Sequence, residues 1–216
     1  MKRGLAALSL GLLALGFVAL GVWQVERRAW KLRLIAAVDA RAQAAPVAAP
    51  MTADAEDDSY RHVRVTGRFV GRDTLVQAVT ARGPGFWVLA PLATRGGWTV
   101  LVNRGFVPDE RRIARPAGET SVTGLLRITE PGGGFLRAND PAAGRWYSRD
   151  VAAIARARGL TRVVPYFVDA EAGPPGYPVG GLTVVAFRNN HLVYALTWFA
   201  LAGLSGYGLW RVLRER

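Results

Sequence analysis

The chain of 216 residues contains no cysteine and only two histidines, His62 and His191. Without cysteine it has no disulfide bonds, no thiolate metal sites, no haem attached through a cysteine pair and no cysteine nucleophile. The absence does not decide the compartment, because exported domains can fold without disulfides. Any metal-binding or proton-transfer chemistry based on imidazole must therefore use one of two positions.

The motifs of common enzymes are also missing. The glycine run at 132–134 is not followed by the Lys-Ser/Thr of a phosphate-binding loop, and no Gly-x-Ser-x-Gly elbow occurs. Ser205 lies among glycines inside an apolar segment, where small residues favour helix packing. No Ser-His-Asp set or pair of catalytic carboxylates stands out, and His62 lies in an alternating strand pattern typical of a structural residue. The sequence predicts a protein that is not an enzyme.

Acidic residues are scarce, at 16 against 28 Lys and Arg, for a net charge of +12. The arginines are scattered, and no basic stripe with interleaved aromatics appears, so no nucleic-acid partner is expected. The one acidic run, at 54–58, lacks the spacing and the glycine of a calcium loop. It is predicted to be a solvated segment.

Two long segments without charged side chains lie near the ends of the chain, at 4–25 and 192–210. Each is about long enough to cross a hydrocarbon core. A signal peptide would have a shorter apolar region and a small-residue cleavage site, but the first segment ends at Trp23 and a charged stretch. We therefore expect an integral membrane protein whose partner is the lipid bilayer, with transmembrane helices at 4–25 and 190–210.

Basic residues flank the outer ends of both segments, which by the positive-inside rule predicts cytoplasmic termini. They are Lys2, Arg3, Arg211, Arg214 and Arg216. A second basic group opposes this orientation, because it follows the first segment on the other side: Arg27, Arg28, Lys31 and Arg33. The second segment decides the prediction, since Arg188 alone on one side faces three arginines on the other.

Between the spans, residues 26–59 predict a helix extension and an Ala/Pro/Asp-rich linker, and 60–188 predict an extracytoplasmic β-rich domain. Asp150 is suited to cap a short helix over 151–158 that Gly159 closes. Two-residue alternation broken by Gly and Pro predicts seven strands, at 60–70, 74–80, 86–93, 98–106, 120–129, 162–169 and 182–187. The expected fold is one mainly antiparallel β domain, barrel- or sandwich-like, flanked by two transmembrane α-helices.

One face of the second span joins an imidazole, a large aromatic side chain and small residues. At helical spacing it comprises His191, Ala195, Trp198, Ala202, Ser205 and Leu209. In one interpretation a haem lies against this face, with His191 as axial ligand to the iron and Trp198 beside the macrocycle. In the other, more common situation the small residues pack on the first span, and His191 and Asn190 form hydrogen bonds at the interface. Both interpretations can hold together.

Three blocks of sequence resemble the Surfeit-locus-one proteins, a family of assembly factors for cytochrome c oxidase. The first lies at the end of the first span, the second in the central domain and the third at the start of the second span. The motif positions are Trp23, Gln24, Arg27 and Trp30, then Asn103, Arg104 and Gly105, then Asn190 and His191.

The resemblance implies a non-enzymatic assembly factor, in bacteria located in the inner membrane with its domain in the periplasm. It further implies haem a as a transient cofactor bound through His191 and inserted into oxidase subunit I. A cofactor-free chaperone that stabilises an oxidase assembly intermediate is the alternative. Arg104 ends an apolar strand, and a fold-stabilising contact is the more common role for such a residue than contact with a partner.

Overall fold

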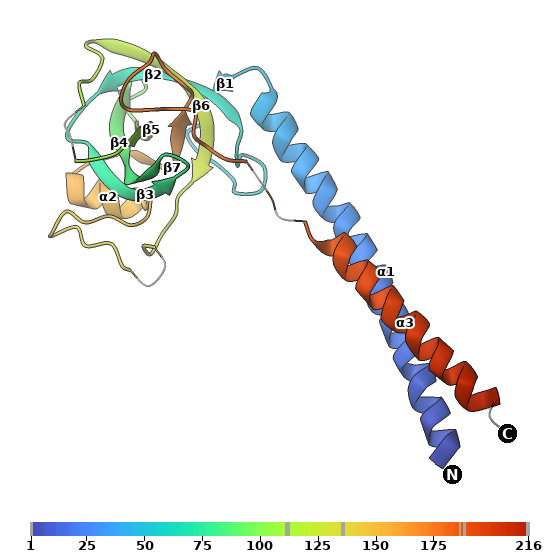
Figure 1. Cartoon of the computed structure of the whole chain (residues 1–216). Coiled ribbons are helices and arrows are strands. Elements are labelled where there is room, and N and C mark those ends of the chain that lie inside the picture. The colour runs from blue at the N-terminus through green and yellow to red at the C-terminus, as the bar shows by residue number, and fades with distance from the viewer. Residues whose placement is uncertain (1, 111–112, 135–136, 186, 188, 215–216) are drawn as a thin grey trace. The chain divides into compact units, whose positions relative to one another are not determined.

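The computed structural model describes residues 2–110, 113–134, 137–185, 187 and 189–214, and it divides into two compact units. One unit contains residues 1–37 with 185–216, and the other contains residues 38–184 (Figure 1). Three residues used in the predictions, Ala186, Arg188 and Arg216, lie outside the described ranges.

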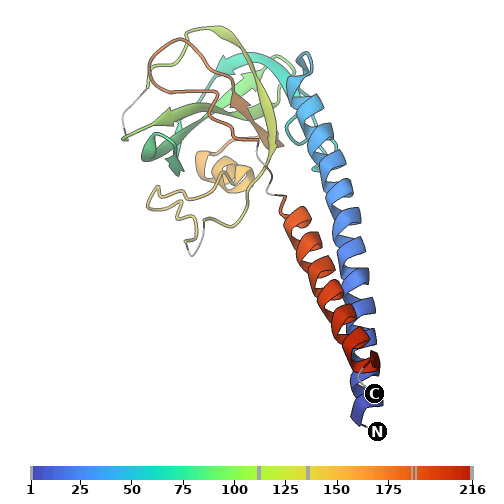
Figure 2. The same cartoon turned by 45° about the vertical axis from the view of Figure 1, so that its right-hand side comes forward.

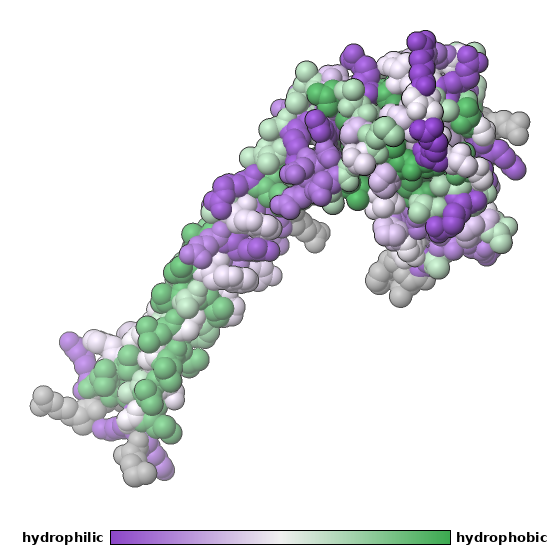
Figure 3. All heavy atoms as spheres, turned by 180° about the vertical axis from the view of Figure 1, so that it is seen from behind, coloured by the Kyte–Doolittle hydropathy of each residue, from purple (hydrophilic) through white to green (hydrophobic). Residues whose placement is uncertain are grey.

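The first unit is a pair of long helices, α1 (Lys2–Gln43) and α3 (His191–Arg214). By length and composition both are able to cross a membrane. They run side by side with the two chain termini at the same end (Figure 2), and a band of hydrophobic side chains covers the middle of the pair (Figure 3). The two predicted membrane helices are present, and α1 continues without a break beyond its apolar segment.

The second unit is a β barrel with a short helix. The described residues of this unit form β1 (Val47–Ala48), β2 (His62–Phe69), β3 (Thr74–Thr80), β4 (Gly83–Thr94), β5 (Thr99–Val107), β6 (Glu119–Ile128) and β7 (Val163–Ala170). They follow the order β1-β2-β6-β7-β5-β4-β3, and an added pairing of β2 with β4 closes five of them into a barrel (Figure 1). Only the β1–β2 and β5–β7 pairs are parallel. The predicted fold class is confirmed.

The barrel domain has two hydrophobic cores because its central strands are buried on both faces. Val100, Val102 and Tyr166 point into one core, while the intervening Leu101 and Phe167 point into the other. Strands covered on both sides read as continuous apolar runs. This explains why the stretch around 100–102 shows no alternation, whereas β2 alternates buried and exposed positions.

Helix α2 (Val151–Arg158) covers the second core through buried Val151 and Ile154. The Asp150 side chain accepts a hydrogen bond from the backbone N–H of Ala153. Gly159 ends the helix in the left-handed conformation, with φ of 62°. Both capping predictions are confirmed.

Three details differ from the sequence prediction. Residues 182–185 and 187 are not a strand, because the Thr183 side chain donates to Asp169 instead of the backbone joining the sheet. The glycine-proline stretch expected to break the chain at 83–85 begins β4. A Cβ on Gly85 would lie 2.3 Å from the Val107 carbonyl oxygen, so glycine permits this close strand pairing. The short β1 was not predicted.

The acidic run is largely exposed, as predicted, from Asp54 to Asp57. Arg41 holds its backbone by donating to the carbonyl oxygens of Glu56 and Asp57, at 2.7 and 2.6 Å. Asp58 is half-buried, and the hydrogen bond from the Asp54 backbone N–H lowers the pKa of its carboxyl. The run therefore acts as a tethered turn of the domain.

Candidate functional site

The site predicted around His191 lies at one end of the seam between α1 and α3. Gln24 of α1 is 9% exposed, and its Oε1 lies 2.7 Å from His191 Nδ1. Because a carboxamide oxygen only accepts hydrogen bonds, this pair places the imidazole proton on Nδ1. The lone pair then resides on Nε2. No described residue is a partner of Nε2.

The rest of the seam is filled by protein side chains. Trp198 stacks on Phe17 of α1 with ring centroids 5.6 Å apart and an interplanar angle of 21°. Ala195, Ala202 and Ser205 are buried on the same face of α3. The packing interpretation of this face is confirmed for these residues, and the role of Trp198 beside a cofactor stays a prediction.

At Gly21 the Phe199 ring of α3 lies close against the backbone of α1. A Cβ built on it would lie 2.5 Å from the Phe199 ring, which no real side chain tolerates. Nearer the two ends of the chain, a Cβ built on Gly208 of α3 would lie 3.5 Å from the Leu10 side chain of α1. Small residues at the interface allow close approach, as is usual for helices in membranes.

The neighbouring motif positions surround the end of the seam. Asn190 is exposed, and its backbone carbonyl accepts a hydrogen bond from the Tyr194 backbone N–H in the first turn of α3, at 3.3 Å. The predicted side-chain hydrogen bond of Asn190 is not formed with any described residue. Asn189 Oδ1 is buried without a hydrogen-bond partner. The chain thus presents an unsatisfied acceptor two residues before His191.

On α1, Trp23 and Trp30 are 52% and 44% exposed, consistent with aromatic residues at a membrane boundary. The guanidinium of Arg27 lies 3.9 Å from the Trp30 ring centroid. Arg27 is therefore held along the helix by a cation–π contact.

The central motif residue Asn103 belongs to a buried polar network in the barrel that sequence reasoning missed. Its amide donates to Asp169 at 2.7 Å, and its oxygen accepts the Gly105 backbone N–H at 3.2 Å. Gly105 has φ of 128°, and a Cβ there would lie 2.3 Å from the Val179 carbonyl. These two motif positions therefore fix the backbone of β5 against its neighbours.

Asp169, 4% exposed, is the centre of this network. It accepts from Arg127 at 2.9 Å, Arg149 at 3.2 Å and Thr183 at 2.9 Å. Glu130 pairs with Arg149 at 2.6 Å. Burial alone would lower the pKa of Arg149, but the hydrogen bond to Glu130 and the Asp169 and Glu130 charges outweigh it and raise the pKa. The network balances two cations with two carboxylates.

Arg104 makes the fold contact expected of it. Its Nη2 donates to the Ala114 carbonyl at 2.7 Å, and its guanidinium lies 5.5 Å from the Phe69 ring centroid. Nη1 is buried without a hydrogen-bond partner, and burial lowers the pKa of the guanidinium. Contact of Arg104 with a partner protein stays a prediction.

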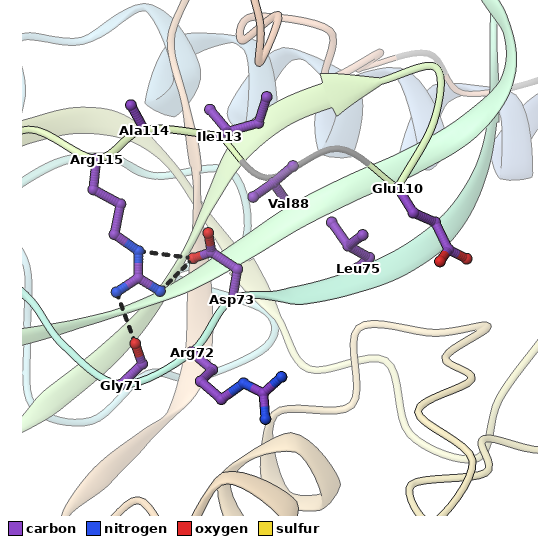
Figure 4. Close-up of a pocket in the computed structure, with 9 residues that line it drawn as sticks. All are labelled: Gly71, Arg72, Asp73, Leu75, Val88, Glu110, Ile113, Ala114 and Arg115. Atoms are coloured by element: carbon purple, nitrogen blue, oxygen red, sulfur yellow. Dashed lines mark hydrogen bonds and ion pairs between the residues drawn. The ribbon is translucent and has the colours of Figure 1, made fainter.

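A cavity of about 740 Å³ opens on the barrel beside this region. Figure 4 shows its apolar lining by Leu75, Val88 and Ile113. Arg115 is committed to Asp73, at 2.6 Å, and to the Gly71 carbonyl, at 2.9 Å (Figure 4). None of the predicted site residues lines this cavity.

His62, the other histidine, is a structural residue as expected. Its Nδ1 lies 2.6 Å from the Ala44 carbonyl oxygen and its Nε2 lies 2.7 Å from Glu171. Among the described residues no group of three or more His, Asp or Glu is arranged to hold a metal ion. The role of His191 as an axial ligand to a haem iron stays a prediction.

Comparisons with known proteins agree with the three sequence blocks. The model of the SURF1 family matches residues 11–203, a range that includes most of α1, the whole barrel domain and the first half of α3. Surfeit locus protein 1 of Mus musculus is 36% identical over 219 residues, covering 88% of this chain and 70% of that protein. The Homo sapiens protein is 37% identical over 220 residues, covering 88% and 71%. A SURF1-like protein of Monosiga brevicollis is 33% identical over 220 residues, covering 91% and 83%.

Proposed function

Because this chain belongs to the SURF1 family, we propose that it is a membrane-bound, non-enzymatic assembly factor for cytochrome c oxidase that assists insertion of haem a into subunit I. The observation that carries the proposal is the extent of the match, which spans 11–203. The matched range therefore includes the barrel, Gln24 and His191, and most of the helix pair. The partners are oxidase subunit I and its assembly intermediates.

The geometry of His191 supports haem as cargo. A histidine that binds a metal usually donates its second ring N–H to an oxygen, which fixes its tautomer and orientation. Gln24 provides that oxygen at 2.7 Å, so Nε2 would be the atom of His191 that ligates the iron. Bound haem a would supply an open coordination site on iron for this nitrogen. The chain's residues would hold the cargo, and they carry out no covalent step.

The cofactor-free chaperone is the second candidate, and the filled seam favours it. Trp198 has a protein partner in Phe17, and Ala195, Ala202 and Ser205 of α3 are buried. In this role the helix pair and the barrel would stabilise an oxidase intermediate by contact alone. Absorption spectra separate the two candidates, because only the first predicts a bound chromophore.

The location is part of the proposal: a bacterial inner membrane crossed by α1 and α3, with the barrel in the periplasm and both termini in the cytoplasm. Basic outer flanks support this orientation. Alkaline phosphatase fused after Ala93 should be active, and the same enzyme fused after the last residue should be inactive. The opposite pattern would reverse the orientation.

The haem arm of the proposal, meaning that the chain binds haem a through His191, is tested on the full chain purified from a host that makes haem a. We expect a Soret band from the wild type, its loss in His191→Ala, and unchanged abundance of that variant in the membrane. Trp198→Ala should lower haem content less, since it removes only aromatic contact area. His62→Ala is the matched control and should keep its haem. Equal haem in wild type and His191→Ala would assign His191 to packing.

The assembly role is tested separately by deleting the gene. Oxidase activity and its haem a signal should fall, while the upstream respiratory complexes stay near normal. Complementation with His191→Ala then distinguishes the candidates, because a cofactor-free chaperone would restore the oxidase and a haem carrier would not. Normal oxidase in the deletion strain would contradict the family role for this chain.

A further inference from the structure

The seam of α1 continues past the last residue that α3 covers. Residues at steps of three and four place one stripe on a helix. On α1 this stripe meets α3 at Phe17, which stacks on Trp198, at Gly21, which faces Phe199, and at Gln24, which contacts His191. The next two positions of the same stripe are Arg28 and Lys31.

Helix α3 begins at His191, opposite Gln24, so it offers no helical partner to these two positions. With a rise of about 1.5 Å per residue, Arg28 lies about 6 Å and Lys31 about 10 Å further along α1 than Gln24. Arg28 is exposed and Lys31 is partly buried. Neither forms an ion pair with any residue in the described part of the chain.

The other charges of this stretch do not share the stripe. Arg33 follows Gln24 by nine residues, which at 3.6 residues per turn places it on the opposite side of the helix. Glu26, the nearest acidic residue, lies about 160° from Gln24 by the same geometry. Arg27 is adjacent to the stripe but contacts the Trp30 ring at 3.9 Å. Two cations with no counter-ion among the described residues therefore sit directly beyond the Gln24–His191 pair.

We propose that Arg28 and Lys31 bind the carboxylates of the tetrapyrrole that His191 ligates, an inference that rests on the haem arm of the proposed function. A haem carries its iron at the centre and two propionate carboxylates at one edge. The imidazole of His191 lies opposite Gln24, and the two cations lie further along the α1 stripe, an arrangement that matches this distribution of charge. Charge-assisted hydrogen bonds from Arg or Lys to a carboxylate are stronger than neutral ones.

In this arrangement Gln24 is a positioning residue, and Arg28 and Lys31 set the direction of the cargo. The carboxylate edge would point along α1 away from the apolar seam, and the hydrophobic edge toward the membrane-spanning part. This orientation keeps the charged edge out of the hydrocarbon core, where carboxylates are costly. Arg28 and Lys31 belong to the basic group after the first span that opposes the predicted topology. The inference gives these two residues a function.

The test uses the full chain purified in detergent and titrated with ferric protoporphyrin IX or with its dimethyl ester, which lacks the two negative charges. Wild type should bind the free acid more tightly than the ester. The Arg28→Gln/Lys31→Gln double variant should bind the acid roughly tenfold more weakly, a loss of ~1.4 kcal/mol, and should bind acid and ester alike. Its Soret maximum should stay at the wild-type position, because His191 still ligates the iron.

Matched variants separate this role from general charge and from folding. Arg33→Gln removes one positive charge on the opposite side of α1 and should keep the preference for the free acid. Arg28→Lys/Lys31→Arg retains both charges and should also keep it. If Arg33→Gln weakens binding as much as the double variant does, the effect is non-specific electrostatics and the inference fails.

Two further outcomes are distinguishable. If the wild type binds neither porphyrin, the haem arm of the proposed function fails, and this inference fails with it. If the wild type binds through His191 but does not distinguish acid from ester, only the inference fails. Loss of co-purified anionic phospholipid from the double variant, with porphyrin affinity unchanged, would assign the two cations to lipid headgroups and would also overturn the inference.

Discussion

The helix pair and the barrel domain place their polar side chains in opposite ways. In the barrel, Asp169, Arg127 and Arg149 are buried and paired at the centre of the fold. In the helix pair, the one side chain–side chain hydrogen bond among the described residues lies at the end of the seam, between Gln24 and His191. The other described contacts between the two helices involve aromatic rings, leucines and glycines.

The difference shows which polar groups are structural. Asp169, Arg127 and Arg149 are paired with one another in the barrel, and removing the carboxylate leaves the two guanidinium groups without it in a low-dielectric interior. The helix pair is held by close packing at Gly21 and by the Phe17–Trp198 stack, which do not depend on the polar end. A polar pair that packing does not require is the better candidate for binding.

The largest expected loss of stability is that of the barrel variant Asp169→Ala. Removing the carboxylate leaves Arg127 and Arg149 without their shared buried partner, which should cost about 3–5 kcal/mol of domain stability. Chemical denaturation followed by tryptophan fluorescence measures it. The control is Glu119→Gln, which breaks the exposed pair with Arg95 and should leave the midpoint unchanged. Similar midpoints for both variants would show that burial does not strengthen the network.

A smaller effect is expected in the helix pair from Gly21→Leu. Its side chain overlaps the Phe199 ring, so the ring or the helices must shift, at a cost of about 1–3 kcal/mol. Because the chain has no cysteine, a Leu10→Cys/Gly208→Cys background reports the contact by disulfide formation. The cross-link should weaken in Gly21→Leu and persist in Gly16→Leu, since nothing lies within 4 Å of a Cβ at Gly16. Equal cross-linking would contradict close packing at Gly21.

The smallest effect concerns the pH dependence of the barrel domain. The backbone N–H of Asp54 lowers the pKa of Asp58 below 3.8, with burial opposing and Arg61 assisting. A carboxyl with a lowered folded-state pKa contributes stability above its ordinary pKa, and this is lost as pH falls through the folded value. Asp58→Asn should therefore be less stable than wild type at pH 7, and the gap should close below pH 3.8. A gap that is constant with pH would exclude this linkage.

Much of the fold followed from local patterns. Alternation placed β2 and β3 within two residues of their ends, and Asp150 with Gly159 bounded α2 correctly. The prediction of a strand at 182–187 was wrong for residues 182–185 and 187, which do not pair with the sheet, and the Thr183 hydroxyl donates to Asp169. An alternating pattern indicates an extended chain, but pairing depends on which edge is available.

The sequence predicted which residues of α3 form the candidate site, but it did not predict which residues of α1 they contact. The face of α3 that includes His191 and Trp198 follows from helical periodicity alone. Its partners on α1 do not, because the rotation and offset of two helices depend on where close packing is possible. Because Gly21 has no side chain, the Phe199 ring fits against α1 at this position. In the same register of the two helices, Phe17 stacks on Trp198.

The sequence by itself determined the two apolar spans, the β-rich middle and the candidate imidazole, because each depends on residues adjacent in the chain. Tertiary structure alone decided that Gln24 lies against His191, 167 residues away, and that Asn103 lies against Asp169, 66 residues away. Such pairs form only when separate elements adopt one register. Close packing selects that register, and the polar groups are then brought within hydrogen-bonding distance.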